Sequence, residues 1–271
     1  MKQSTINKTV KISGIGLFSG VQVNLELIPS DIDTGIVFSV KGHNILATYD
    51  NIINTDRRTI IGNDSIQIHT VEHLMAAFYM KNITNIIVKM DSFEPPILDG
   101  SATGFVEAIN KVGVKQQEGE ILPIVISKRI EYDIPSKDSY IIALPYDGFK
   151  ITYITDYPTC DGIADEEFSV DVLFGGGNND VEIAGARTYC LSSELLELSR
   201  KNFLKGASLD NGIVYIDNNI NDEIEEELIS RFDIDKNSFS NKIINKSGLR
   251  FDNEAARHKI LDILGDFFFT R

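Results

Sequence analysis

The sequence predicts an α+β protein in which one architecture occurs twice. Two observations support this fold class. Each half of the chain begins with alternating apolar and polar residues typical of half-buried strands, and apolar residues at helical spacing follow in both halves. A polar, charged and glycine-containing stretch at 115–120 is the best candidate for a linker between them. We therefore expect a first domain at 1–118 and a second at 119–271.

In the first half we expect strands, a hairpin and two helices. Val21, Val23 and Leu25 alternate with polar residues, which predicts a strand at 21–27. Thr70 is expected to cap a helix that runs to about Lys81. Ser101 is expected to cap a second helix, which ends at Gly113. The other expected elements are strands at 36–40 and 85–90 and a hairpin turn at 62–64.

The second half repeats the order of strands before helices. Expected strands lie at 124–134, 140–144, 150–155, 167–172 and 212–216, and expected helices at 192–201 and from about 253 to the end. Three glycines at 175–177 lack the lysine of a phosphate-binding loop, so they predict a turn. The acidic stretch Asn218–Lys246 reads as a surface excursion that contains one short helix.

Composition excludes several classes of function. The chain has 271 residues, of which 42% are hydrophobic and 24% charged, as in globular proteins. No apolar run is long enough for stable membrane insertion, and the N-terminus lacks the apolar core of a signal peptide. A formal net charge of −14 argues against nucleic acid as a partner. The two cysteines fit a reducing compartment and, with the missing signal peptide, lead us to expect a cytoplasmic protein. We also expect a monomer.

The stretch from Arg257 to Asp266 carries the first sign of chemistry. Helical spacing puts His258, Asp262 and Asp266 in one row, with His258 and Asp262 one turn apart and able to bind one metal ion. An ion pair on an exposed helix face is the alternative reading. Of the four histidines, His73 is the candidate for a third ligand. Two histidines and one carboxylate form a catalytic zinc pattern, and Fe²⁺ suits the same ligands.

Glu72 directly precedes His73 near the start of the expected helix. Neighbouring residues on a helix point about 100° apart, so Glu72 cannot share the metal with His73. It can flank the metal and accept a proton from a bound water, which is the task of a general base. The alternatives are a solvated carboxylate in a first helical turn for Glu72 and a histidine packed at a domain interface for His73.

Five segments in this order resemble one family of enzymes. They are Gly14–Gly20, Thr70–Leu74, Leu98–Ala102, Ala186–Tyr189 and Arg257–Asp262. Together they resemble the UDP-3-O-acyl-N-acetylglucosamine deacetylases, the zinc amidases of lipid A biosynthesis, over nearly the whole chain. The resemblance implies two similar domains, each a β-sheet carrying two helices, with the helix layers packed face to face and the site between them.

The resemblance also implies an activity and its residues. The expected reaction is Zn²⁺-dependent hydrolysis of the N-acetyl group of a UDP-linked acylated sugar, which releases acetate in the committed step of lipid A biosynthesis. His73, His258 and Asp262 match the zinc ligands and Glu72 the general base. Thr188 matches a hydroxyl that stabilises the oxyanion.

Further residues match parts of the family's substrate site. Lys259 matches a residue near the substrate's phosphates, which makes it both a catalytic and a binding candidate, and Tyr157 falls where an aromatic residue lies against the uracil. Tyr189, beside Thr188, is another binding candidate. The family threads the acyl chain through an apolar passage that corresponds here to 203–216, with Leu204 and Leu209 as candidate lining residues. Ordinary core packing is the alternative for both leucines.

Two departures from the family pattern stand out. The stretch 218–246 is longer than the usual connection. The family also continues past Asp266 for a few tens of residues, which contain a strand and a catalytic histidine. In the family, the residue that matches Asp266 orients this histidine. The present sequence ends at Arg271. We therefore expect the second domain to lack its final strand. The alternative function is a catalytically impaired protein that binds zinc and a UDP-sugar.

Overall fold

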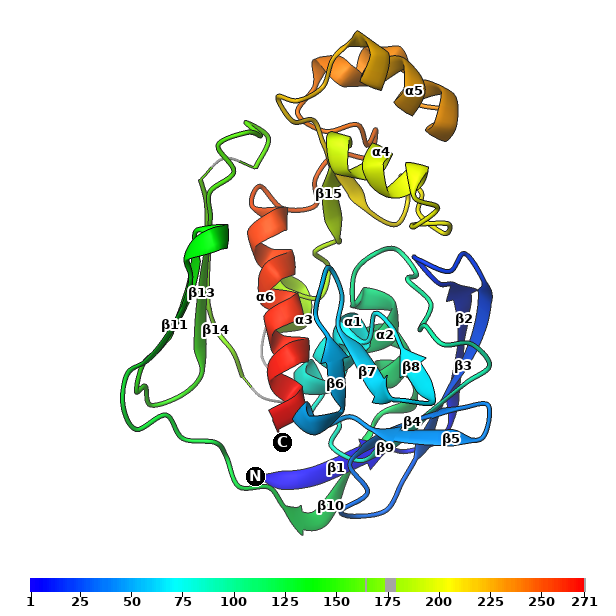
Figure 1. The fold of residues 1–271 in the computed structure, drawn as a ribbon. Helices are drawn as coiled ribbons and strands as arrows, with labels where there is room; N and C mark the ends of the chain where they lie inside the picture. The colour runs from blue at the N-terminus through cyan, green and yellow to red at the C-terminus, as the bar shows by residue number, and fades with distance from the viewer. Residues whose placement is uncertain (164, 174–178, 271) are drawn as a thin grey trace.

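The computed structural model describes residues 1–163, 165–173 and 179–270, and it confirms the α+β class. The predicted glycine turn at 175–177 lies outside the described residues. Two helices from distant parts of the sequence, α1 (Glu72–Met80) and α6 (Glu254–Phe267), lie side by side near the centre of the molecule (Figure 1). Sheets flank this pair on either side, so helices from both halves meet between them.

The first half is built on a five-stranded sheet in the order β2-β3-β9-β4-β5. Its strands are β2 (Val10–Ile15), β3 (Gln22–Pro29), β4 (Ile36–Val40), β5 (His43–Leu46) and β9 (Ile86–Met90). All pairs are antiparallel except β4 with β9. A second sheet contains β6 (Ile52–Asn54), β7 (Ile60–Asn63) and β8 (Ile66–Ile68), and its β7–β8 pairing confirms the predicted hairpin.

Two predicted helix starts need correction. Helix α1 begins at Glu72, and Thr70 does not cap it, because the Thr70 hydroxyl donates a hydrogen bond to Oε1 of the buried Glu94 at 3.0 Å. Helix α2 (Thr103–Val112) begins two residues after Ser101, although the Ser101 hydroxyl accepts a hydrogen bond from the N–H of Thr103 at 3.2 Å. It ends as predicted at Gly113, whose φ of 75° suits a residue without a side chain.

The predicted linker at 115–120 was wrong, because these residues lie in a strand. Strand β10 (Val114–Glu120) pairs antiparallel with β1 (Lys2–Ile6) at the start of the chain. Most of its side chains are exposed, which explains the polar composition. The division of the chain between residues 118 and 119 stays a prediction.

The described residues of the second half form three separate strand pairs. Strands β11 (Ile130–Ile134) and β12 (Ser139–Ala143) form one hairpin, and β13 (Lys150–Thr155) and β14 (Glu166–Asp171) form another, which packs on α6. The parallel strands β15 (Tyr189–Leu191) and β16 (Ile213–Tyr215) flank α4 (Ser192–Arg200). Several large apolar residues of the first hairpin are exposed, among them Ile130, Tyr132 and Tyr140. The short α3 (Asn179–Glu182) precedes β15.

The acidic stretch at 218–246 contains helix α5 (Asp222–Phe232), which confirms the predicted helix. It is more than a surface excursion. Leu228 is fully buried and packs with Leu195 and Leu196 of α4 in a second apolar cluster. Helix α5 is therefore fastened to α4 through a core of its own.

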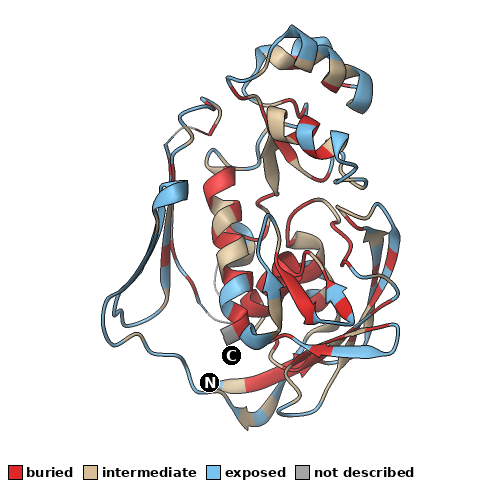
Figure 2. Cartoon of the chain, in the orientation of Figure 1, coloured by how far each residue is buried: buried red, intermediate tan, exposed pale blue. Residues whose placement is uncertain are grey.

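The main core spans both halves of the chain. It contains residues from the five-stranded sheet and from α1, α2 and α6. Helix α1 is buried along its whole length, and Figure 2 shows buried residues along much of α6. Gly265 of α6 lies against the backbone of Glu72, so the two helices approach without an intervening side chain. This contact sets the distance between the first turn of α1 and the last turn of α6. No helix within the described ranges is long and apolar enough to cross a membrane.

Candidate functional site

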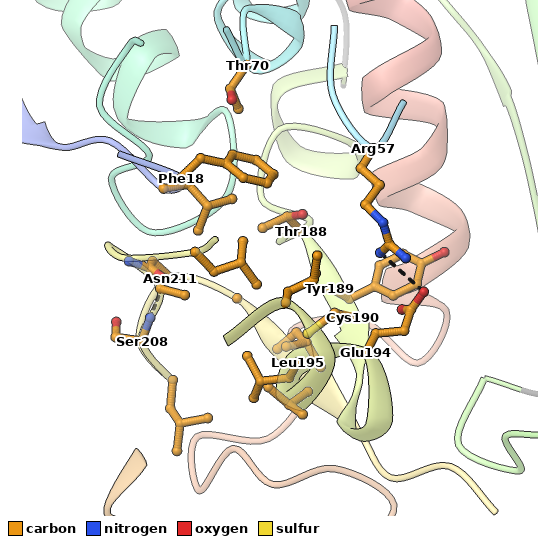
Figure 3. A pocket seen from close by; sticks show the side chains of 18 of the residues that line it. Phe18, Arg57, Thr70, Thr188, Tyr189, Cys190, Glu194, Leu195, Ser208 and Asn211 are labelled. Carbon is orange, nitrogen blue, oxygen red and sulfur yellow. Dashed lines mark hydrogen bonds and ion pairs between the residues drawn. The ribbon is translucent and has the colours of Figure 1, made fainter. Parts of the chain in front are cut away.

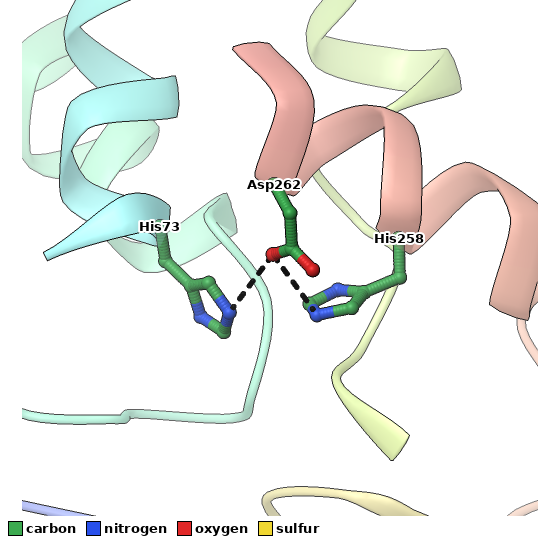
Figure 4. Close-up of side chains that lie close together, drawn as sticks. All are labelled: His73, His258 and Asp262. Atoms are coloured by element: carbon green, nitrogen blue, oxygen red, sulfur yellow. Dashed lines mark ion pairs between the residues drawn. The ribbon is translucent and has the colours of Figure 1, made fainter. Parts of the chain in front are cut away.

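Three side chains from the two ends of the chain meet where α1 crosses α6. His73 projects from the first turn of α1, and His258 and Asp262 lie one turn apart on α6 (Figure 4). Oδ1 of Asp262 lies 3.7 Å from Nε2 of His73 and 3.4 Å from Nε2 of His258. One potential ligand atom from each residue falls within 4.8 Å of the others. The structure thus brings together the three residues predicted as metal ligands.

Both histidines are in the form that binds metal ions. Burial lowers the pKa of His73 to about 3, with a further contribution from His258, and burial also lowers the pKa of His258. Both rings are therefore neutral at pH 7. Nδ1 of His258 lies 3.0 Å from the carbonyl oxygen of Ala186, which can only accept a hydrogen bond. Nδ1 consequently carries the proton, and the lone pair of Nε2 faces Asp262.

Asp262 supplies the negative charge of the trio. Burial raises the pKa of its carboxyl, whereas His258 and Lys259 lower it. The lowering effects together are larger, so the pKa lies below its ordinary value. Nζ of Lys259 lies 3.0 Å from Oδ2, on the side away from the histidines. Oδ1 of Asp262 and Nδ1 of His73 are buried and lack a hydrogen-bond partner among the described residues. Two imidazoles, one carboxylate and these unsatisfied atoms fit a divalent metal ion.

Glu72 lies beside this trio, only 7% exposed. Its Oε2 accepts a hydrogen bond from the backbone N–H of Thr59 at 3.1 Å. Burial, followed by the negative charge of Asp262, raises the pKa of its carboxyl to about 8. A carboxyl that titrates near neutral pH suits proton transfer, because it can hold and release a proton under working conditions.

Thr59 is a site residue that sequence reasoning missed. Besides its bond to Glu72, its hydroxyl donates a hydrogen bond to Oδ1 of Asp266 at 2.6 Å. Asp266 was expected to orient a histidine, and in the described part of the chain its partner is this threonine. No motif marks Thr59, which precedes an ordinary hairpin strand. Its role follows from the tertiary fold alone.

Glu72 and His73 also line a pocket, which Figure 3 shows from close by. Four of the residues singled out in the sequence line this pocket: Thr188, Tyr189, Leu204 and Leu209. Tyr157 and Lys259 are absent from its walls. Tyr157 contacts the site indirectly through its hydroxyl, 3.3 Å from that of Tyr189.

Several wall residues of the pocket were not predicted from the sequence. Arg57 and Glu194 form an ion pair of 3.3 Å across one side, drawn in Figure 3, and Phe18 lies opposite. Helices α4 and α5 add apolar walls through Leu195, Leu198 and Phe232, and Thr70, Ser208 and Asn211 add polar ones. The pocket therefore combines several polar side chains with a mainly apolar lining.

Thr188 lines the pocket, and two backbone hydrogen bonds hold it in place. Its N–H donates to the carbonyl of Gly100 at 2.7 Å, and its carbonyl accepts from the N–H of Ile213 at 2.8 Å. The preceding Arg187 is buried and grips Glu254 of α6, with Nε 2.8 Å from Oε1 and Nη2 3.0 Å from Oε2. Such a two-point ion pair ties the strand end that carries Thr188 to the helix that carries His258.

Comparisons with known proteins agree on one family. The family model described as LpxC, UDP-3-O-acyl N-acetylglycosamine deacetylase, matches residues 3–230 and 237–271. A UDP-3-O-acyl-N-acetylglucosamine deacetylase of Thermodesulfovibrio yellowstonii is 36% identical, over 97% of this chain and 81% of its own length. The enzyme of that name from Chlamydia pneumoniae is 34% identical, over 97% and 86%. The chain spans only 57% of a bifunctional LpxC/FabZ enzyme of Chlorobaculum tepidum, at 34% identity.

Proposed function

Because the chain belongs to the UDP-3-O-acyl N-acetylglycosamine deacetylase family, we propose that it hydrolyses the N-acetyl group of UDP-3-O-acyl-N-acetylglucosamine with the help of a zinc ion. The products would be acetate and the free amine, in the committed step of lipid A biosynthesis. The observation that carries the proposal is the convergence of His73, His258 and Asp262 beside Glu72 at the wall of a pocket.

His73, His258 and Asp262 would hold the ion, and Fe²⁺ fits the same donors. Zinc bound there would supply a Lewis acid that polarises the acetyl carbonyl and acidifies a water molecule. Nδ1 of His258 donates its proton in a hydrogen bond to the Ala186 carbonyl, and this bond holds the ring in the orientation in which Nε2 can bind a metal.

Glu72 is the group we assign to proton transfer. The Thr59 N–H holds Oε2, so Oε1 is the oxygen that would take a proton from the attacking water and return it to the departing amine. The pKa of about 8 belongs to the protein without a metal, and a nearby dication favours the carboxylate and lowers that pKa. Thr188 would donate its hydroxyl to the oxygen that becomes negative during attack.

The remaining predicted residues are assigned to the substrate. The apolar lining of the pocket would take the acyl chain between Leu204 and Leu209. Lys259 would neutralise phosphate charge, and its pairing with Asp262 keeps it protonated. Tyr157 and Tyr189 would form the aromatic wall on the nucleotide side. The cytoplasmic location and the monomeric state expected from the sequence remain predictions.

The test compares Glu72→Gln with the wild-type protein in acetate release from the UDP-linked substrate and in bound zinc. We expect zinc content near that of the wild type and a loss of about 10²–10⁴-fold in kcat. Glu107→Gln, on the exposed face of α2, is the matched control and should change neither quantity.

His73→Ala should abolish zinc binding, because two ligands remain. A wild-type protein that binds zinc and the UDP-sugar but releases no acetate would support the alternative, a non-catalytic binding protein. Wild-type protein without stoichiometric metal after incubation with zinc would refute the assignment of the three ligands.

A further inference from the structure

Most of helix α5 falls within the ranges matched by the family model, but its last residues do not. The two ranges matched by the family model leave out residues 231–236, at the end of α5. Phe232, the last residue of the helix, lies in this gap and lines the pocket. A residue outside the matched ranges therefore supplies a wall of the proposed substrate site.

The position of Phe232 is held firmly. The helix ends directly after it, because Asp233 adopts a left-handed conformation with φ of 52°. Leu228, one turn earlier, is fully buried. Glu227 accepts hydrogen bonds from Arg200 of α4 at 3.2 Å and from Arg231 at 2.7 Å, so that the two helices are also joined by charge.

Phe232 lies at the end of the pocket opposite to Glu72 and His73. Glu72 and His73 line the pocket from α1, whereas α5 lies on the far side of α4 from α1 (Figure 1). The walls between these ends are mainly aliphatic and include Leu195, Leu198, Leu204, Leu209 and Val214. An unbranched hydrocarbon chain that enters beside Glu72 therefore meets the aromatic ring of Phe232 at the far end.

We propose that Phe232 closes the pocket and sets the maximum length of the fatty acyl chain that the enzyme accepts. The inference rests on the proposed function, since it assumes that the acyl group occupies the pocket. Removing the ring opens space continuous with the pocket, and each additional methylene buried there improves binding by about fourfold.

The test is a series of UDP-3-O-acyl-N-acetylglucosamines with saturated acyl chains of increasing length. We expect kcat/KM of the wild type to rise with chain length and then fall sharply. In Phe232→Ala the fall should come at chains longer by two or more carbons, and in Phe232→Trp at shorter chains. Phe232→Leu is a milder variant that serves if Phe232→Ala unfolds. Ile229→Ala is the matched control, because Ile229 packs in the same α5 cluster without lining the pocket, and it should keep the wild-type profile.

Binding of the same series to Glu72→Gln protein, measured by calorimetry, separates the two proposals. Absence of turnover by the wild type would overturn the proposed function, while the length dependence of binding still decides the role of Phe232. Identical length profiles for the wild type and Phe232→Ala, in turnover or in binding, would overturn the inference. A shift of the same size in Ile229→Ala would overturn it as well, since loosening of α5 would then be the cause.

Discussion

Replacing Gly265 with alanine should push α1 and α6 apart and loosen the metal site between them. A Cβ at this position would overlap the carbonyl oxygen of Glu72 and lie 2.9 Å from its carbonyl carbon and 3.1 Å from its Cα. All three are backbone atoms of α1, so no side chain can rotate away to make room. The overlap with the oxygen is the tightest of the three contacts, so the helices must separate by about an ångström before ordinary contact is restored.

This separation has a cost in stability and in metal affinity. Overpacking a close contact costs about 1–3 kcal/mol, whereas alanine in a helix otherwise gains about 0.5–1 kcal/mol over glycine. We therefore expect a net loss of about 1–2 kcal/mol in the free energy of unfolding. His73 moves with α1, while His258 and Asp262 move with α6. Metal–ligand distances tolerate only about 0.2 Å, so zinc affinity should fall as well.

Urea denaturation and zinc titration of Gly265→Ala measure the two effects. Gly104→Ala is the control, because its Cβ meets the flexible end of Leu98 at 2.7 Å, which can move aside. We expect this control to lie within about 1 kcal/mol of the wild type and to bind zinc normally. A Gly265→Ala protein with wild-type stability and zinc affinity would refute the view that this helix contact sets the geometry of the site.

Three further predictions concern buried charge near the site. In the metal-free folded protein, burial raises the pKa of Glu72 from 4.5 to about 8, so its carboxyl keeps a proton. The resulting contribution to the free energy of unfolding is complete below pH 4.5 and is lost as the pH rises to 8. Denaturation of chelator-treated protein across this range should show the decline, and Glu72→Gln should flatten it. Arg187→Met leaves Glu254 buried without its partner and should lower the free energy of unfolding by about 3–5 kcal/mol in urea denaturation; a loss under 1 kcal/mol would contradict this. The milder Arg187→Lys should lower kcat through Thr188, so a double-mutant cycle with Thr188→Ala should be non-additive, and additive losses would argue against that coupling.

The sequence predicted best where a local pattern coincides with the tertiary contact. The spacing of His258 and Asp262 on one helix, and of Glu72 and His73 at the start of another, is visible without the fold. Local patterns failed at 115–120, where polar residues form a strand because they pair with 2–6 at the other end of the first half. Long-range pairing leaves no mark in the composition of an exposed edge strand.

Composition also obscured the role of α5. Its many acidic residues favoured a solvated excursion, yet Leu228 and Phe232 lie one turn apart on the helix face that packs against α4 and reaches the pocket. That spacing was available in the sequence. The pocket it helps to close was not, because the other walls come from segments far away in the chain.

The precision of the candidate site depends largely on residues that have no chemistry of their own. His73 and His258 belong to different halves of the chain, and the absence of a side chain at Gly265 lets their helices approach. The carbonyl of Ala186 selects the tautomer of His258, and the N–H of Thr59 holds Glu72. A search for ligands and bases passes over such residues, since a glycine and backbone groups carry no functional motif. Substitutions at these supporting positions should therefore reduce metal binding or turnover while every predicted ligand and base remains in place.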